Sequence, residues 1–345
     1  MSRASINAAM ASAIVVLTAA CTQRPATPAH IVERARVSMG SELHLTAWTA
    51  DEAAATSAFD AVFNEFDRLE SLMSNWRAGS DVERLNAAAG DHPVPVSRDT
   101  IAVLQTAHQV SEWTGGKFDV TFGVLSGLWK FDHDQDNTIP DMNEVRKRLP
   151  LINYRALIVD AQAGTAFLQH AGMRVNLGGI GKGYAVDRGV AIMRERGFRD
   201  FMIQSGGDMY VAGQRDGHPW RLGIQDPRGR ENQVFARVDL SDSTFSTSGD
   251  YERSFVKDGR RYHHIIDPTT GEPAYGARSA TIMTDRAVIA DGLSKAVFFL
   301  GVEKGMALLE QLHVEAVVVS PKNEVLVTPG LKGRLQLVSA PTDAP

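Results

Sequence analysis

The chain has 345 residues, with 36 lysines and arginines against 41 aspartates and glutamates, so its formal net charge is −5. Hydrophobic residues make up 43% and charged residues 22%, a balance that is typical of folded proteins and excludes a disordered chain. No polybasic block occurs, so nothing favours a nucleic-acid partner. The single cysteine excludes a disulfide framework and a metal site built from several thiolates.

The first thirty residues predict export. Arg3 precedes an apolar run from Ala8 to Ala20, which is too short to span a membrane comfortably. Small residues directly before the lone Cys21 resemble a lipoprotein signal, although Leu17 lies one position earlier than the usual leucine. We expect a lipid-anchored protein of the bacterial envelope that faces the periplasm; the alternatives are plain secretion and an unprocessed tail. The expected organisation is a signal over 1–21, a tether over 22–30, one domain over 31–338 and a flexible tail over 339–345.

Hydrophobic periodicity predicts an α+β fold. Helices are expected over 51–76, from a capping box at Ser80–Glu83, around 101–108, and over about 182–196, 291–300 and 302–312. Strand-like runs cover 156–160, 173–177, 200–204, 209–212, 221–224, 280–284, 316–319 and 325–328. Asp258-Gly259 predicts a hairpin, and 131–140 a surface loop. Because helices come first and strands dominate later, without regular alternation, α+β is favoured over a doubly wound sheet.

The glycine-rich segment Asn176–Gly183 lies between a predicted strand and a predicted helix. Free N–H groups at a helix start and the charge of Lys182 would favour an anion, and a phosphate is the natural guest. The segment is neither a Walker loop nor a dinucleotide fingerprint, because its residue types and glycine spacing differ from both. The alternative is a turn that only packs helix on strand.

Three further segments carry polar residues. Ser205-Gly206-Gly207-Asp208 predicts a tight turn, and without a nucleophile elbow it does not favour a Ser-His-Asp hydrolase. In the segment from Tyr262 to Gly271, adjacent histidines point to opposite faces of a strand, and Asp267 can simply cap a turn. Asp291 precedes Ser294 and Lys295 on one helix face, where it can cap the helix or offer oxygen to a hard cation.

Taken in order, these segments resemble the ApbE-type FAD:protein FMN transferases. The resemblance runs from Met39-Gly40 to about Gly301, nearly the whole mature chain. Its motifs are Met39-Gly40, Met73–Trp76, Gly116–Asp119, Asn176–Gly183, Ser205–Asp208, Thr247–Asp250, His264–Pro268 and Ala290-Asp291. The resemblance implies an ApbE-like fold, with mixed or antiparallel sheets flanked by helices, a helix-rich first half and a strand-rich second half.

The resemblance also implies an activity: transfer of the FMN half of FAD to a threonine or serine hydroxyl of a target protein, with release of AMP and with Mg²⁺ as helper. By matched positions, the residues expected to bind FAD are Met39, Trp76, Lys117, Phe118, Asp119, Asn176, Lys182 and Ile266. The metal positions are Gly179, through its carbonyl, Asp291 and Ser294. His264 with Asp267 is the best available pair for a base that accepts the proton of the target hydroxyl.

Two positions depart from the family pattern. Asn176 stands where many members have aspartate, and Lys295 where the family often places a metal-binding threonine. A protonated lysine cannot ligate Mg²⁺ and repels it. Either the metal site is weakened, or Lys295 points away and Ser294 supplies the hydroxyl, or Lys295 is a tolerated variation.

Two other functions fit the same residues: a Mg²⁺-dependent FAD pyrophosphatase that yields FMN and AMP, and a non-catalytic FAD-binding lipoprotein. The resemblance implies that the acceptor is a flavin-bearing subunit of an extracytoplasmic electron-transport complex, and that the membrane is reached through a lipid on Cys21.

Overall fold

A long antiparallel hairpin opens the described part of the chain, which in this computed structural model comprises residues 28–131 and 135–344. Strands β1 (His30–Ser38) and β2 (Ser41–Thr49) pair over their full length around the turn Met39-Gly40, where both residues have positive φ. The predicted signal, Cys21 and most of the tether lie outside the described residues. This hairpin was not predicted from the sequence, because β1 is an edge strand with few buried side chains and therefore lacks an apolar alternation.

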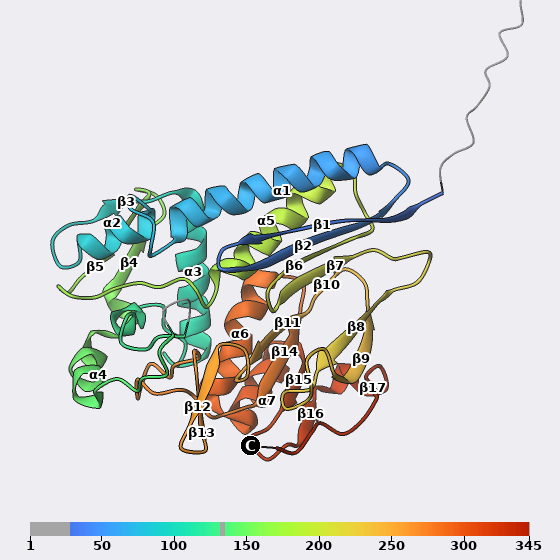
Figure 1. The fold of residues 1–345 in the computed structure, drawn as a ribbon. Helices are drawn as coiled ribbons and strands as arrows, with labels where there is room; N and C mark the ends of the chain where they lie inside the picture. Colours follow the sequence, from blue (N-terminus) through green and yellow to red (C-terminus); the bar gives the residue numbers. More distant parts are fainter. Residues whose placement is uncertain (1–27, 132–134, 345) are drawn as a thin grey trace, which may run out of the picture.

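Two antiparallel sheets form the centre of the fold (Figure 1). The first has the order β1-β2-β6-β7-β10, and the second has the order β11-β14-β15-β16. The added strands are β6 (Phe201–Ser205), β7 (Asp208–Ala212), β10 (Ser243–Thr244), β11 (Ser246–Gly249), β14 (Ser279–Met283), β15 (Glu315–Val319) and β16 (Val325–Val327). The smaller sheets are β3 (Val94–Pro95) with β5 (Thr165–Leu168) and β4 (Leu157–Asp160), β17 (Gln336–Leu337) with β9 (Val234–Leu240) and β8 (Trp220–Gln225), and the ribbon β12 (Ser254–Lys257) with β13 (Arg260–His263).

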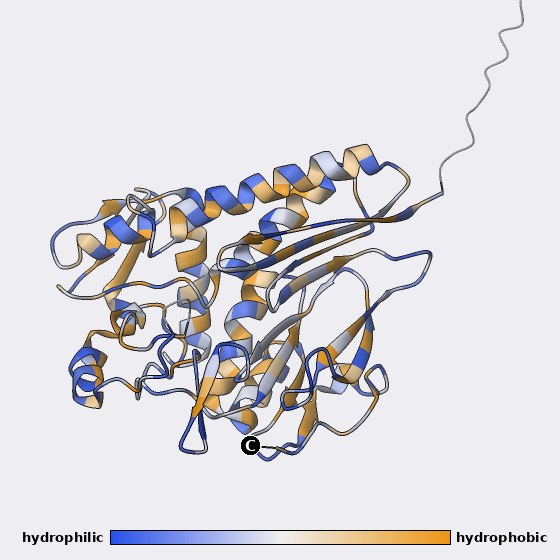
Figure 2. Cartoon of the chain, in the orientation of Figure 1, coloured by the Kyte–Doolittle hydropathy of each residue, from blue (hydrophilic) through white to orange (hydrophobic). Residues whose placement is uncertain are grey.

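Helices pack against these sheets, and Figure 1 shows α1 and α5 lying over the first one and α6 in the middle of the molecule. Their bounds are α1 (Glu52–Met73), α2 (Asp81–Ala87), α3 (Arg98–Trp113), α4 (Met142–Arg148), α5 (Gly181–Glu195), α6 (Ala287–Leu300) and α7 (Val302–Gln311). Hydrophobic and hydrophilic residues alternate along α1 (Figure 2), whose buried side includes Phe59, Val62 and Phe66. Most of α6 is buried. One apolar core therefore joins α1, α5 and α6 to the first sheet.

The α+β class with antiparallel sheets is confirmed, and so are several local predictions. Ser80 caps α2 through its hydroxyl, which accepts a hydrogen bond from the Glu83 N–H at 3.0 Å. Asp258 and Gly259 both have positive φ, as a two-residue hairpin turn requires. The helix-rich first half and the strand-rich second half are also as expected, although the two strands β1 and β2 precede every helix in the described residues.

The strand expected over 173–177 is absent, although the segment is apolar. The backbone of Val175 is paired by a side chain: its N–H donates to Asn86 Oδ1 at 2.6 Å, and its carbonyl accepts from Asn86 Nδ2 at 3.0 Å. Only an isolated bridge, between Arg174 and Phe122, resembles strand pairing. The segment is therefore extended but held by α2, which directs the following glycine loop toward α5.

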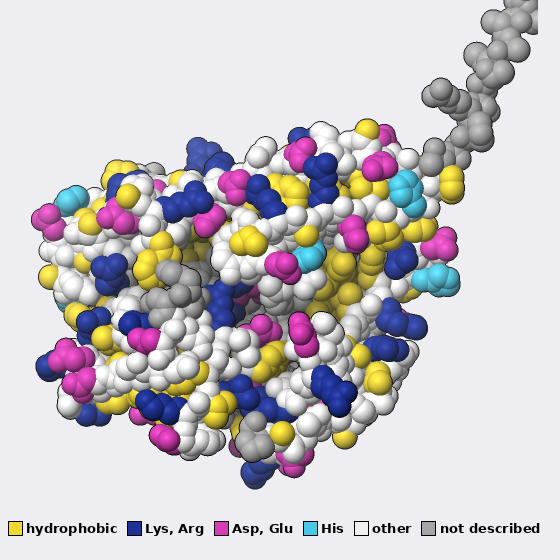
Figure 3. All heavy atoms as spheres, in the orientation of Figure 1, with side chains coloured by type: hydrophobic (Ala, Val, Ile, Leu, Met, Phe, Trp, Pro, Cys, Tyr) yellow, Lys and Arg dark blue, Asp and Glu magenta, His cyan; other side chains and the backbone are white. Residues whose placement is uncertain are grey.

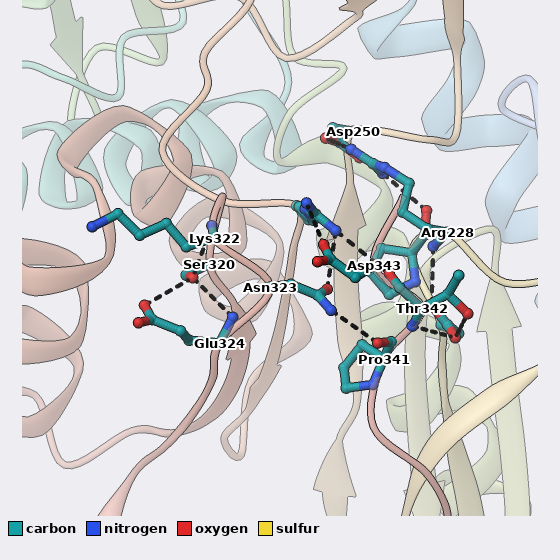
Figure 4. A network of polar contacts seen from close by, with 12 residues as sticks. Arg228, Asp250, Ser320, Lys322, Asn323, Glu324, Pro341, Thr342 and Asp343 are labelled. Atoms are coloured by element: carbon teal, nitrogen blue, oxygen red, sulfur yellow. Dashed lines mark hydrogen bonds and ion pairs between the residues drawn. The ribbon is translucent and has the colours of Figure 1, made fainter. Parts of the chain in front are cut away.

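The C-terminal segment, expected to be a flexible tail, is attached through Thr342 and its neighbours (Figure 4). Thr342 donates to Asp226 through both its N–H, at 2.9 Å, and its hydroxyl, at 2.7 Å. Nearby, the buried guanidinium of Arg228 donates to both oxygens of Asp250, at 2.6 and 2.8 Å. This bidentate pair fixes Asp250, directly after β11, and with it the end of the Thr247–Asp250 segment.

Candidate active site

A cavity of about 690 Å³ lies where the tip of the first hairpin, the start of α5 and the middle of α6 meet. Figure 3 shows a hollow near the middle of this face, with lysine and arginine side chains in it. The volume lies in the range of cofactor-sized sites. The sequence-predicted residues that line the cavity are Met39, Trp76, Phe118, Asp119, Asn176, Gly179, Lys182, His264 and Ile266. The predicted residues Lys117, Asp267, Asp291 and Ser294 do not line it.

Apolar and aromatic side chains form one part of the wall. Phe118 and Ile266 are buried beside it, whereas Trp76 is 73% exposed. Met39 sits at the hairpin tip with φ 50°, and this backbone conformation is rare for a side-chain-bearing residue. An exposed indole and a flexible thioether suit contact with a flat ring system.

The glycine-rich loop forms the opposite part of the wall. Asn176 Oδ1 accepts from the Gly178 N–H at 2.8 Å, and Asn176 Nδ2 donates to Ser126 Oγ at 3.2 Å. The Asn176 amide therefore shapes the loop, and it does so without the negative charge that aspartate would add. No side chain caps the start of α5 from its own N-cap residue, Ile180.

Instead, α5 and α6 cap each other. Asp291 in α6 accepts from the Gly183 N–H in the first turn of α5 at 3.0 Å. Asp187 in α5 accepts from the N–H groups of Ala287 and Val288 in the first turn of α6, at 2.7 and 3.1 Å. Asp291 thus lies one turn inside α6. It caps α5, whereas the sequence suggested a cap of its own helix. Burial raises the pKa of Asp187 to about 6, against the effect of its two hydrogen bonds.

The reciprocal capping of α5 and α6 requires glycine at position 183. A Cβ there would clash with the Ala287 carbonyl and would lie 2.7 Å from Asp291 Cβ. A serine or threonine, as in a Walker loop, would not fit between the two helices.

Lys182 extends from α5 toward the turn between β6 and β7. Its ammonium lies 3.5 Å from Asp208 Oδ2, and both side chains are largely buried. Burial lowers the pKa of Lys182, but Asp208 and Asp291 outweigh it and raise the pKa above its usual value, so the lysine is charged. Burial and the charge of Asp291 raise the pKa of Asp208 to about 6. The Ser205–Asp208 motif is therefore a turn that holds Lys182, and Ser205 is fully buried.

The Lys117–Asp119 stretch is anchored by its polar groups. Asp119 accepts from the Thr121 N–H and hydroxyl and from the Tyr154 N–H, at 2.6 to 2.8 Å. Its carboxylate therefore orders the backbone that presents Phe118 to the cavity. Lys117 donates to the Thr269 hydroxyl at 2.8 Å and lies 3.8 Å from Asp267.

His264 lines the cavity, and its Nδ1 is buried without a hydrogen-bond partner in the described residues. Burial, together with the charges of nearby His263, Arg253, Lys295 and Lys182, lowers the pKa of His264 well below its usual value. The ring is therefore neutral at physiological pH, and it is a weaker base than a histidine in water. The Asp267 carboxylate accepts from the Thr269 N–H at 2.7 Å and thus stabilises its own turn. Among the described residues, its hydrogen bonds do not reach His264.

The ammonium of Lys295 lies at Asp291, one of the three predicted metal positions. That ammonium donates to Asp291 Oδ1 and, at 3.0 Å, to the Asp291 carbonyl; it also reaches Ser248 Oγ at 3.3 Å. Ser294 Oγ is 2.7 Å from Ser248 Oγ and 2.9 Å from the Asp291 carbonyl, and it is buried. The stem of Lys295 passes beside Gly179. Within residues 28–131 and 135–344, no group of three acidic, histidine or cysteine residues is placed to hold a metal.

The oxygen set is therefore filled and does not fit Mg²⁺ as it stands. Lys295 does not point away, and the Ser294 hydroxyl is not available in its place. Against burial, Lys295 and Lys182 together hold the pKa of Asp291 below its usual value, so the carboxylate is ionised and paired.

Sequence reasoning missed Arg253, Trp129 and Phe299 among the residues that line the cavity. Arg253 donates to the Gly40 carbonyl at 3.0 Å and adds a third cation beside Lys182 and Lys295. It lies outside every motif, so only its distance of three residues from the Thr247–Asp250 segment could have indicated it.

The fold and the cavity together define an α+β protein with a site for an anionic ligand that also carries a flat, partly apolar group. A family model described as "ApbE family" matches residues 39–318. The chain belongs to the ApbE family, as its motifs predicted.

Similar proteins agree in name and in structure. The chain is 33% identical over 294 residues to a FAD:protein FMN transferase of Klebsiella pneumoniae, covering 85% of this chain and 90% of that one. It is 32% identical over 324 residues to one of Treponema pallidum, covering 89% of each. The solved ApbE protein of Thermotoga maritima superposes with a TM-score of 0.81 at 29% identity, covering 88% of this chain and 99% of that one. The flavin transferase ApbE of Vibrio cholerae gives a TM-score of 0.79 at 27% identity, with 89% and 100% covered.

Proposed function

We propose that this enzyme transfers the FMN half of FAD to a threonine or serine hydroxyl of an acceptor protein and releases AMP. The observation that carries the proposal is the single cavity that combines the cations Lys182, Arg253 and Lys295 with an apolar wall that includes Trp76 and Met39. A dinucleotide with a flavin ring needs both parts: positive charge for the diphosphate and a flat surface for the ring.

The reaction is a phosphoryl-type displacement. The acceptor oxygen forms a bond to the phosphorus of the FMN half, while the bond from that phosphorus to the bridging oxygen breaks and AMP leaves with the bridging oxygen. The proton of the hydroxyl passes to His264, whose ring lines the cavity and is neutral. Negative charge grows on the departing phosphate, where the cations Lys182, Arg253 and Lys295 stabilise it.

Mg²⁺ was expected from the sequence, but the Asp291 carboxylate that would hold it already accepts a hydrogen bond from Lys295. No step of this mechanism therefore passes through a metal ion.

One assay separates transfer from the two other functions. The mature protein is incubated with FAD and a flavin-accepting domain, and the products are separated on a denaturing gel viewed under ultraviolet light. A fluorescent acceptor band supports the proposal. FMN and AMP in solution without a labelled acceptor would indicate a pyrophosphatase, and intact FAD would indicate a binding protein; either result contradicts it.

We further propose that the protein acts outside the cytoplasm, held to the membrane by a lipid on Cys21, on a subunit of an electron-transport complex. The sequence before residue 30 supports this proposal. In the described residues, none of the helices has both the length and the apolarity needed to cross a membrane. Metabolic labelling with a radioactive fatty acid should mark the wild-type protein and not Cys21→Ala, and equal labelling would contradict the anchor.

A further inference from the structure

The ammonium of Lys295 lies among three oxygen atoms that accept its hydrogen bonds. An ammonium has three donors, and the three acceptors here are Asp291 Oδ1, the Asp291 carbonyl and Ser248 Oγ. Asp291 is completely buried, and the Lys295 side chain is 13% exposed. The lysine is therefore held by the protein rather than extended into solvent.

The two buried ion pairs of this cluster are each neutral without a metal, and Arg253 adds a further cation to the same cavity. Lys182 and Lys295 face Asp208 and Asp291, so two cations meet two ionisable carboxylates. A divalent ion at Asp291 would have to displace the Lys295 ammonium or lie beside it, and like charges at that distance repel strongly in a buried site.

Lys295 also lines the cavity. Lys295 lines the cavity next to Gly179 and Lys182, the part of the wall that faces an anionic group. The Lys295–Asp291 pair therefore lies at the part of the cavity where the diphosphate is proposed to bind.

We propose that Lys295 is a built-in cation that takes the place of a protein-bound divalent metal in this cavity, so that the enzyme stabilises its anionic ligand without binding Mg²⁺ at Asp291. This inference rests on the proposed function for its ligand, but its central claim concerns metal binding and can be tested without FAD.

The direct test is binding of Mn²⁺ alone to the mature protein, with free Mn²⁺ followed by electron paramagnetic resonance. The wild type should bind no Mn²⁺ at Asp291. Lys295→Thr, which removes the ammonium and adds a hydroxyl, should bind one ion at least about tenfold more tightly. Lys304→Thr is the matched control, because it makes the same change at an exposed site on the next helix, and it should behave as the wild type. A wild-type Mn²⁺ site that disappears in Asp291→Asn would overturn the proposal, whether or not Lys295→Thr folds.

A second readout is FMN transfer in excess chelator. The wild type should keep its rate within about twofold when EDTA replaces Mg²⁺, whereas Lys295→Thr should need the metal. A wild-type rate that falls with EDTA, together with a Mn²⁺ site lost in Asp291→Asn, would refute the built-in cation. If the wild type transfers no FMN under any condition, the proposed function fails, and the Mn²⁺ measurement still decides the role of Lys295.

Discussion

The environment of single side chains decides what each can do in this cavity. His264 and His263 are neighbours, but only His264 lines the cavity, while His263 is fully buried and packs against Tyr275 and Phe298. The alternation of side chains along an extended segment accounts for this division. The sequence predicted that the two histidines point to opposite faces of a strand. It did not predict which of them lines the cavity, because that depends on how the ribbon β12–β13 packs against α6.

Replacing His264 should lower the rate of FMN transfer without weakening FAD binding. His264→Gln keeps a polar side chain but removes the base, so FMN transfer should fall at least about 100-fold. FAD affinity, measured by fluorescence quenching, should stay within about twofold, because the cations and the apolar wall remain. A variant that binds FAD normally and still transfers at the wild-type rate would contradict the role of His264.

Asp267, expected as the partner of His264, illustrates why motif positions do not assign roles. Its carboxylate stabilises the turn that follows and lies near Lys117. A turn cap and a catalytic partner use the same residue type in the same place, and only the coordinates distinguish them.

At the scale of elements, the crossing of α5 and α6 sets the geometry of the cavity floor. Their starts lie so close that Gly183 meets the backbone of Ala287, and each helix supplies a carboxylate to the other. The sequence predicted both helices and the importance of the glycines. It could not predict the exchange of caps, since the partners lie 100 or more residues apart.

A methyl group at the crossing should separate the helices. Gly183→Ala should lower the free energy of unfolding by about 2 kcal/mol or more, because its Cβ would overlap backbone atoms that cannot move aside. Gly181→Ala is the matched control in the same turn, since its Cβ would meet only Leu177 and Met39 at 3.8 and 4.0 Å. Urea unfolding measures both, and equal losses would contradict the crossing as the cause.

The Asp187 cap should make stability depend on pH. Its pKa is about 6 in the folded protein, above the value of about 3.9 in an unfolded chain. Between these values the folded state keeps a proton that the unfolded state releases, so the free energy of unfolding falls as pH rises. Asp187→Asn cannot titrate at this position, so its free energy of unfolding does not fall in this way. Relative to the wild type, its free energy of unfolding should rise by up to about 3 kcal/mol from about pH 4 to about pH 7.

Urea unfolding across this pH range provides the test. Asp160→Asn is the control, because Asp160 also accepts from two backbone N–H groups but is exposed. A difference between Asp187→Asn and the wild type that stays constant, or that shrinks as pH rises, would show that burial of Asp187 is not the cause.

At the scale of the whole molecule, the cavity draws residues from position 39 to position 299. The fold class and the order of most elements were predictable from periodicity and turn residues. The first hairpin and the attached C-terminal segment were not, because charged edge strands and irregular segments carry no periodic signal.

Ligand binding should stabilise the whole domain, since the cavity joins both sheets through α5 and α6. FAD at about 100 times its dissociation constant should raise the free energy of unfolding by about 2.7 kcal/mol and shift a single transition. Scanning calorimetry with and without FAD measures this effect. Two transitions, of which only one responds to FAD, would show that the site belongs to one part of the chain alone.

The exchange of caps between α5 and α6 also sets the order of events when the protein is made. The carboxylate that completes the start of α5 belongs to a residue 108 positions later, so a growing chain has the glycine loop long before it has Asp291. A chain that ends before α6 therefore lacks the Asp291 cap of α5, and under the proposed function it could not yet bind FAD.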